Sequence, residues 1–370
     1  MKKLRSQIRL QSLQRADYSI ILLVVLLSLF GLLMIFESSN VSAFKDFNDK
    51  YHYIRDQSIY FLVGTAGMIV TSFIPYKNYY RWSLVLLIFT LVSLMAVFIP
   101  GIGIKALGAH RWISLGSFNF QPAELAKLSL VLYLSAWFSS KEKERLGPFL
   151  LLIGMIVGLV IIEPDLGTAI ILTSIAIIVY FLSGAPLFHF AILIPSVVAV
   201  GVLFAISSPY RMQRLTTFFN PEGDPLGASY HIRQILISLG SGGLFGMGLG
   251  ASRQKYQFLP EATTDSIFAI IGEEFGYIGA IVLIFIYAIL LYKIARVAKN
   301  ARDKHGFLLA GGLLALLGCQ VGINLGAIVA LFPLTGVPLP FISYGGSNLI
   351  VSLIATGIII NVSKNSSLRK

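Results

Sequence analysis

Ten separate apolar runs, each long enough to cross a lipid bilayer, restrict the fold of this chain more than any other feature. A membrane-spanning helix needs about 20 predominantly apolar residues. Helices are therefore expected near residues 19–36, 57–74, 83–100, 121–138, 148–163, 167–183, 186–206, 265–292, 308–330 and 338–362. The pattern predicts an all-α polytopic membrane protein with about ten transmembrane helices.

The composition agrees with this prediction and excludes several classes of function. With 56% hydrophobic and 12% charged residues, the chain has too little polar surface for a soluble globule. The formal charge of +12 does not indicate a nucleic-acid partner, because the Lys and Arg residues fall mostly in short loops, where they set membrane topology. The single cysteine, Cys319, lies in an apolar run and excludes an intrachain disulfide.

The distribution of basic residues predicts the orientation in the membrane. A cytoplasmic N-terminus assigns most of the 29 Lys and Arg residues to the cytoplasm, with both termini on that side. We predict a single transmembrane domain over residues 1–370, with a basic cytoplasmic tail over residues 1–18. Residues 207–264 form one large extracytoplasmic loop between the seventh and eighth helices. Its mixture of turn and apolar residues favours ordered, half-helical structure over disorder. Smaller outer loops are expected at residues 37–56 and 101–120.

The segment LPEATTDSIFAIIGEEFGYIG, residues 259–279, places Asp265 where the large outer loop meets the eighth helix. One interpretation is a helix cap, since an acid after two threonines complements the helix dipole. The other is a general base at the outer membrane face. It would work if partial burial raises its pKa, or if the proton departs late, once the new bond has begun to form. Deeper in the same helix, Glu273 and Glu274 are expected to pair with buried cations or donors, or to be protonated.

Further polar residues lie at the outer ends of the predicted helices. In QPAELAK, Glu124 and Lys127 stand three apart on one helix face, either as a self-neutralising pair or as an anion site in which Glu124 holds Lys127. Arg111 of GAHRWISLG is either a phosphate ligand or a membrane anchor. Asp165 of EPDLGT is expected to cap the sixth helix. No nucleotide-binding loop, zinc cluster or catalytic triad is visible.

These motifs, taken in order, resemble the SEDS family (shape, elongation, division and sporulation), the FtsW/RodA group of bacterial cell-wall proteins. The resemblance covers nearly the whole chain. The sequences LGASRQK and LTGVPLPFISYGGS resemble the FtsW branch more than the RodA branch. The motifs that carry it are GAHRWISLG, FQPAELAK, EPDLGT, YHIRQ, GSGGLFGMGLG, LPE with Asp265, and PLPFISYGGS.

The resemblance implies a glycosyltransferase that polymerises lipid II at the outer face of the bacterial cytoplasmic membrane and releases undecaprenyl pyrophosphate. In this reaction Asp265 would be the catalytic base. Magnesium or manganese would help to neutralise the leaving pyrophosphate, although the sequence shows no dedicated metal ligands. The substrate-binding residues that we expect are Arg111, Lys127, Glu124, Asp165, Gln121, Arg211, Arg214, Gln234 and Ser343.

The implied partners are lipid II, a class B penicillin-binding transpeptidase and other divisome or elongasome membrane proteins, while the choice between division and elongation stays open. Two further hypotheses are a lipid II flippase and a noncatalytic scaffold for the transpeptidase. Three residues that differ from the usual family motifs bear on activity. Thr263 stands at the usual histidine of LPEAHTDF, Ser266 at its phenylalanine, and Asn348 at the second serine of YGGSS.

Overall fold

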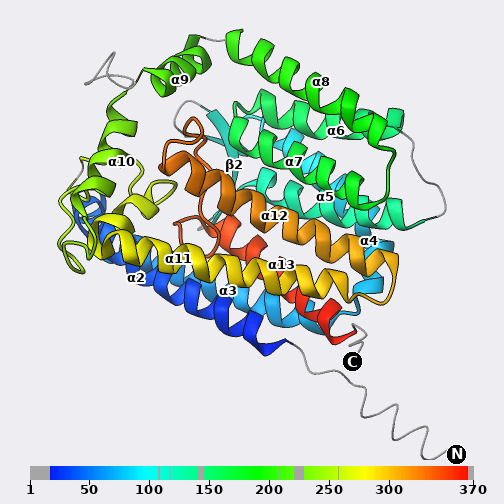
Figure 1. Cartoon of the computed structure of the whole chain (residues 1–370), viewed down its shortest axis with the longest axis horizontal. Coiled ribbons are helices and arrows are strands. Elements are labelled where there is room, and N and C mark those ends of the chain that lie inside the picture. The colour runs from blue at the N-terminus through cyan, green and yellow to red at the C-terminus, as the bar shows by residue number, and fades with distance from the viewer. Residues whose placement is uncertain are drawn as a thin grey trace, which may run out of the picture.

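The computed structural model describes residues 17–106, 109–116, 118–140, 146–207, 209–220, 229–256 and 258–365, with side chains omitted at a few positions inside these ranges. Helices dominate it (Figure 1). The long helices are α2 (Tyr18–Phe47), α3 (His52–Phe73), α4 (Tyr76–Ala96), α5 (Pro122–Ser139), α6 (Leu146–Ile162), α7 (Leu166–Leu182), α8 (Leu187–Ile206), α11 (Ile267–Lys299), α12 (Lys304–Ile328) and α13 (Gly346–Lys364).

Each long helix lies on one of the predicted apolar runs, which confirms the all-α polytopic fold. Among the described residues, six helices are long and apolar enough to cross a membrane by length and composition alone: α2, α4, α8, α11, α12 and α13. Helices α6 and α7 are apolar but have only 17 residues each. Two shorter helices, α9 (Pro209–Phe219) and α10 (Tyr230–Ser241), lie in the predicted outer loop.

Several predicted boundaries are wrong for identifiable reasons. Helix α2 continues to Phe47, so most of the predicted outer loop at residues 37–56 is helical. Its end is set by Asn48, whose positive φ of 54° stops the helix. The last helix begins at Gly346, because the Pro-rich segment before it cannot continue a helix.

The predicted loop at residues 101–120 contains a small antiparallel sheet that the apolar pattern did not predict. Its strands are β1 (Gly103–Ala106), β2 (Ala109–Leu115) and β3 (Phe118–Phe120), in the order β1-β2-β3. In the register, Ile104 lies opposite Trp112, and Ile113 lies opposite Phe120. Strand β3 leads directly into α5, so the sheet sets the outer end of that helix.

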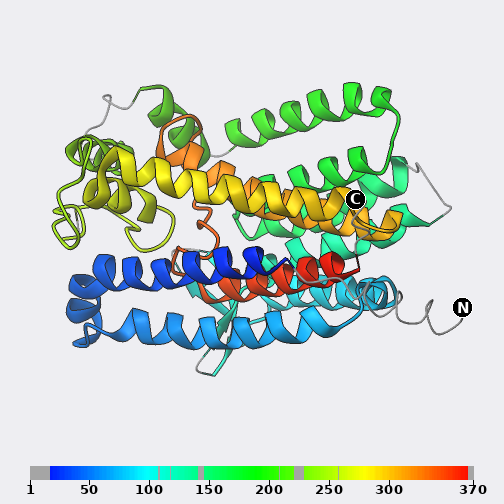
Figure 2. The ribbon, with the colours of Figure 1, turned by 60° about the horizontal axis from the view of Figure 1, so that its bottom comes forward.

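The best-buried helices are α5, α12 and α13, which pack among α3, α4, α7 and α11. Helix α13 lies so close to α3 that a Cβ added to Gly357 would stand 2.3 Å from the carbonyl oxygen of Met68. Small residues permit such close packing between membrane helices. By contrast, α8 lies at the periphery and exposes most of its apolar side chains (Figure 2). Its surface is suited to contact with lipid.

Candidate functional site

The helix below Asp265 is interrupted. At Gly276, φ is 69° and ψ is −170°, which separates a short outer part of α11 from its long inner part. The glycine-rich loop GSGGLFGMGLG packs against this break through backbone hydrogen bonds. They run from Met247 N to Glu273 O (3.0 Å), from Gly248 N to Glu274 O (3.0 Å), from Tyr277 N to Gly243 O (2.9 Å) and from Ile278 N to Leu244 O (3.1 Å). The loop thereby satisfies peptide groups that the break would leave unpaired.

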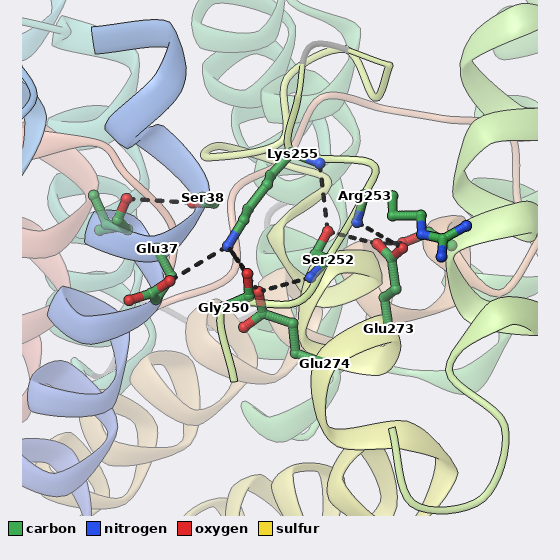
Figure 3. A network of polar contacts seen from close by, with 10 residues as sticks. Glu37, Ser38, Gly250, Ser252, Arg253, Lys255, Glu273 and Glu274 are labelled. Carbon is green, nitrogen blue, oxygen red and sulfur yellow. Dashed lines mark hydrogen bonds and ion pairs between the residues drawn. The ribbon is translucent and has the colours of Figure 1, made fainter. Parts of the chain in front are cut away.

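Beside the break, the buried Lys255 pairs with acids from two distant helices, one buried and one partly exposed (Figure 3). Its Nζ lies 3.3 Å from Glu274 Oε1 of α11 and 3.4 Å from Glu37 Oε2 of α2, and it donates to the carbonyl of Gly250 at 2.7 Å. This pairing is what the sequence predicted for Glu274. The partner lysine was not foreseen, because it lies in a polar loop 19 residues away.

Glu273 is satisfied by donors rather than by a cation. Its Oε2 accepts from the hydroxyls of Ser252 at 2.6 Å and Ser238 at 3.2 Å, and its Oε1 accepts from Arg253 N at 3.1 Å (Figure 3). The backbone N–H of Ser252 reaches Glu274 Oε1 at 3.4 Å. These contacts join α10, the following loop and the outer part of α11 into one unit.

Asp265 does not cap α11. The N-cap position is Ser266, which makes no side-chain cap hydrogen bond. The Asp265 carboxylate accepts from the neighbouring hydroxyl of Thr264 at 3.4 Å and also interacts with its own backbone N–H. Its backbone carbonyl accepts from Asn324 Nδ2 at 2.8 Å, and the same amide donates to Val337 O at 2.8 Å. The turn is thus anchored through its backbone, which leaves the carboxylate available for chemistry.

The surroundings of Asp265 suit a proton acceptor. Burial, reinforced by the nearby Glu261 carboxylate, raises the pKa of Asp265 from 3.8 to about 7, while Arg214 of α9 acts in the opposite direction. A carboxylate with a pKa near the working pH is a far better general base than one near pKa ~4. The partial burial that was one of the two conditions for a working base is therefore present.

A cavity of about 210 Å³ opens beside this turn. Arg214 and His231 line it from α9 and α10, and Leu334 closes it from the segment before α13. The remaining lining residues are Gln213, Thr217, Phe218 and Ile232. Arg214 also donates to the carbonyl of Leu334 at 3.2 Å. One cation, one imidazole and an apolar wall thus lie close to the Asp265 turn.

Sequence reasoning missed His231. Its Nε2 lies 2.8 Å from Ser266 Oγ, directly beside Asp265 in the chain. Burial, followed by the charge of Arg214, lowers the pKa of His231 to about 4. The side chain is therefore neutral at physiological pH. The only available signal was its position in YHIRQ, 35 residues before Ser266, and no local spacing rule links those positions.

A second polar cluster lies between α6 and α7. Asp165 is the N-cap of α7, and its Oδ1 accepts from Thr168 N at 3.0 Å, as the sequence predicted. Arg111 donates from Nε to Glu163 O at 3.0 Å and from Nη2 to Pro164 O. The guanidinium of Arg111 is thus used to hold the turn between the helices.

Glu163 is the residue in this cluster that sequence reasoning overlooked. It is fully buried, and neither carboxylate oxygen has a hydrogen-bond partner among the described residues. Burial, and then the charge of Asp165, raises the pKa of Glu163 to about 8, against the opposing charge of Arg111. The carboxyl is therefore protonated at neutral pH. Glu163 belongs to the EPDLGT motif, of which sequence reasoning considered only Asp165.

The segment before α13 lies between the two clusters. Gln121 Nε2 donates to Asp165 Oδ2 at 3.3 Å, and Gln121 N donates to the hydroxyl of Ser347 at 3.0 Å. A Cβ on Gly167 would lie 2.5 Å from Thr335 O, whereas one on Gly336 would lie 3.9 Å from Asp265 Oδ2. Residues 335–337 therefore touch both the α7 cluster and the Asp265 turn.

The other predicted substrate-binding residues lie in different surroundings. Glu124 and Lys127 form a buried ion pair at 2.8 Å, which is the self-neutralising arrangement. Ser343 is buried, and its hydroxyl accepts from Leu339 N at 2.8 Å. Gln234 is half-buried on α10. Arg211 belongs to α9, but its side chain lies outside the described part of the structure.

The three residues that differ from the usual family motifs each form a hydrogen bond in the structure. The backbone carbonyl of Thr263 accepts from Tyr344 N at 2.8 Å, which ties the Asp265 turn to the SYGG segment. Ser266 is held by His231. Asn348 Oδ1 accepts from Gln320 Nε2 of α12 at 3.0 Å, inside the helix bundle.

Comparison with known proteins identifies the family. The family described as "Cell cycle protein", comprising FtsW, RodA and SpoVE, matches residues 17–368. This chain belongs to that family. It is a multi-pass protein of the bacterial cytoplasmic membrane, as the helices and the family together indicate.

Two curated relatives illustrate how closely it matches. A probable peptidoglycan glycosyltransferase FtsW from Trichlorobacter lovleyi is 41% identical, over 94% of this chain and 93% of the relative. Stage V sporulation protein E of Bacillus subtilis is 37% identical, over 95% of this chain and 97% of the relative.

Solved structures agree with the fold. RodA of Thermus thermophilus, a rod shape determining protein, superposes with a TM-score of 0.71 at 26% identity, covering 95% of this chain and 97% of RodA. A chain from a peptidoglycan synthase complex, studied for the coordination of polymerization and crosslinking, superposes with a TM-score of 0.76. Its identity is 26%, and the match covers 94% of this chain and 97% of that chain.

Proposed function

We propose that this protein is a peptidoglycan glycosyltransferase that polymerises lipid II. The observation that carries the proposal is Asp265, a partly buried carboxylate that has a raised pKa and does not cap its helix. Its pKa is influenced by Arg214, which lines a neighbouring cavity. The relatives named as peptidoglycan glycosyltransferases support the same reaction.

In this reaction the 4-hydroxyl of an acceptor GlcNAc attacks C1 of a donor MurNAc. A new glycosidic C–O bond forms, the bond from C1 to the pyrophosphate oxygen breaks, and the configuration at C1 inverts. Asp265 accepts the hydroxyl proton, and undecaprenyl pyrophosphate departs with the electron pair. Arg214, on the cavity wall, is placed to stabilise developing negative charge. The exposed apolar face of α8 offers a surface for polyprenyl tails.

A divalent cation does not have an evident protein cage. Among the described residues, no group of three or more His, Cys, Asp or Glu side chains is arranged to hold a metal ion. The residues therefore do not fit a resident metal, and no step of the proposed reaction depends on one. Magnesium or manganese dependence stays a prediction that a chelator titration tests.

The proposed partner is a crosslinking enzyme, a class B penicillin-binding transpeptidase. The support is the likeness to a chain of a synthase complex in which polymerization and crosslinking are coordinated. Contacts with further divisome or elongasome membrane proteins belong to the same proposal. A complex of this kind would deliver new glycan strands directly to the transpeptidase.

The test is polymerisation of purified lipid II by the full-length protein, with and without the transpeptidase. We expect Asp265→Asn to reduce the rate by at least about a hundredfold, the usual scale for loss of a general base. Asp49→Asn is the matched control, because Asp49 is an acid at a partly exposed surface pair with Arg55. It should retain wild-type activity.

Three results would count against the proposal. Undiminished product from Asp265→Asn would remove the catalytic role of the carboxylate. An inactive wild type, even with its partner, would favour a scaffold. Crossing of lipid II into proteoliposomes that survives Asp265→Asn would favour a flippase.

A further inference from the structure

The turn that carries Asp265 is clamped from α10 by one imidazole. His231 Nε2 lies 2.8 Å from the Ser266 hydroxyl, and Ser266 is fully buried. The backbone carbonyl of Pro260 is a second hydrogen-bond partner of the ring. His231 therefore holds both ends of the segment 260–266, and Asp265 lies between these two attachment points.

We propose that the His231–Ser266 pair positions Asp265 for proton transfer. This inference rests on the proposed glycosyltransferase function and deepens it by adding a positioning pair to the site. His231 is assigned no direct contact with the substrate in this role. It acts through Ser266, the residue that follows Asp265 in the chain.

The hydrogen-bonding pattern argues that the pair is more than a helix end. A serine at an N-cap normally accepts from a backbone N–H of the first turn, which stabilises a helix by about 1 kcal/mol. Ser266 makes no such bond, and its hydroxyl reaches across to α10 instead. The bond joins Nε2 of His231 to the Ser266 hydroxyl, and its direction depends on the tautomer of the ring. The neutral ring keeps this arrangement throughout the physiological pH range.

The position of the turn controls the charges that Asp265 experiences. The charged and titratable groups that face it are Glu261 in the same turn, Arg214 from α9 and His231 from α10. On the other side, the hydrogen bond from Asn324 of α12 goes to the backbone carbonyl of Asp265 and not to its carboxylate. Without the His231 clamp, the carboxylate would be free to move toward water, and its pKa would fall.

The experiment compares four variants of the full-length protein in the lipid II assay: Ser266→Ala, His231→Leu, the double variant, and His231→Gln. Each single apolar variant should lower kcat by roughly tenfold with little change in KM. One buried hydrogen bond is lost, and the base is slightly displaced as a result. The double variant should be no worse than the singles. His231→Gln should recover most of the activity, because its amide can also form a hydrogen bond with Ser266.

Ser241→Ala is the matched control. Ser241 lies on the same helix, and its hydroxyl bonds only within α10, to Ser238 O at 2.9 Å. This variant should keep wild-type kcat. Ser266→Ala within twofold of wild type, or single effects that multiply in the double variant, would contradict the positioning role.

A second measurement is independent of turnover. The carboxyl C=O band that is present in wild type and lost in Asp265→Asn reports the protonation of Asp265 in infrared spectra. Its titration midpoint should lie near pH 7 in wild type and move lower in Ser266→Ala, as should the acid limb of the pH-rate profile. An unmoved midpoint would overturn the inference. If the wild type fails to polymerise lipid II, the proposed function falls, while the infrared result still decides whether the pair positions Asp265.

Discussion

At the scale of single residues, the surroundings of Asp265 decide its role. An acid after two threonines is an ordinary helix cap in sequence, yet the structure gives that position to Ser266. Burial then raises the pKa of Asp265 to about 7. The same residue type in the α7 cluster, Asp165, does cap its helix. The two aspartates differ in the backbone around them, and the carboxylate of Asp265 is the one that does not cap a helix.

The raised pKa predicts how activity and stability depend on pH. Because the deprotonated form of Asp265 is the base, activity should fall by about tenfold per pH unit below pH 7. For stability, the folded state binds this proton more tightly than the unfolded state, whose pKa is the usual 3.8. The contribution of this bound proton to the free energy of unfolding is complete below pH 3.8 and is lost as the pH rises through 7.

Asp265→Asn should therefore raise the unfolding temperature relative to wild type at pH 8. The gain should shrink as the pH is lowered toward 4, and thermal unfolding in detergent over this range is the measurement. A gain that is equal at both pH values would show that Asp265 has no raised pKa in the folded protein.

At the scale of elements, the break in α11 shapes the site. Gly276 has a backbone conformation essentially restricted to glycine, and a Cβ there would lie 2.3 Å from Gly246 N. The outer part of α11 can therefore end beside the glycine-rich loop, which places Glu273, Glu274 and the Asp265 turn on one short, separately anchored helix.

Gly276→Ala should destabilise the protein by roughly 3 kcal/mol or more, because the strain adds to a clash with backbone atoms. The measurement is the unfolding temperature of the purified protein. Gly240→Ala is the control, since Gly240 is helical and no atom lies within 4 Å of the added Cβ. That variant should be neutral or slightly stabilising. Equal behaviour of the two variants would argue that α11 tolerates a regular helix at Gly276.

At the scale of the whole molecule, Lys255 connects parts that are far apart in the chain. Its Nζ contacts Glu37, which lies in the outer part of α2 and precedes Lys255 by 218 residues. The same atom contacts Glu274 of α11. Figure 3 shows this bridge beside the Glu273 contacts. Because α2 continues to Phe47, Glu37 is part of this helix where it contacts Lys255.

Lys255→Met should cost about 3–5 kcal/mol of stability, because it leaves the buried carboxylate of Glu274 without a cation. Adding Glu274→Gln to this variant should recover much of the loss. Lys293→Met is the control, since its pair with Asp17 is long, at 3.9 Å, and half-exposed, and such pairs contribute at most about 1 kcal/mol. Comparable losses for both lysines would show that burial does not strengthen the bridge.

The sequence by itself determined the helical fold and the position of Asp265 at a helix start. Apolar runs of bilayer length have few alternatives to spanning helices, so their number and order follow from composition along the chain. It also indicated that Glu273 and Glu274 would need buried partners, since unpaired charges are costly in a membrane.

Only the tertiary structure decided which groups meet. Packing brings together segments that no local spacing relates. It sets the pairs of His231 with Ser266 and of Lys255 with Glu37, and it keeps Asp265 from capping α11. It also buries the Glu163 carboxyl without a hydrogen-bond partner among the described residues. The turn at Gly276 and the small sheet before α5 depend on loop conformations for which hydropathy carries no signal. Burial sets the pKa of each acid, and burial is a property of the folded molecule.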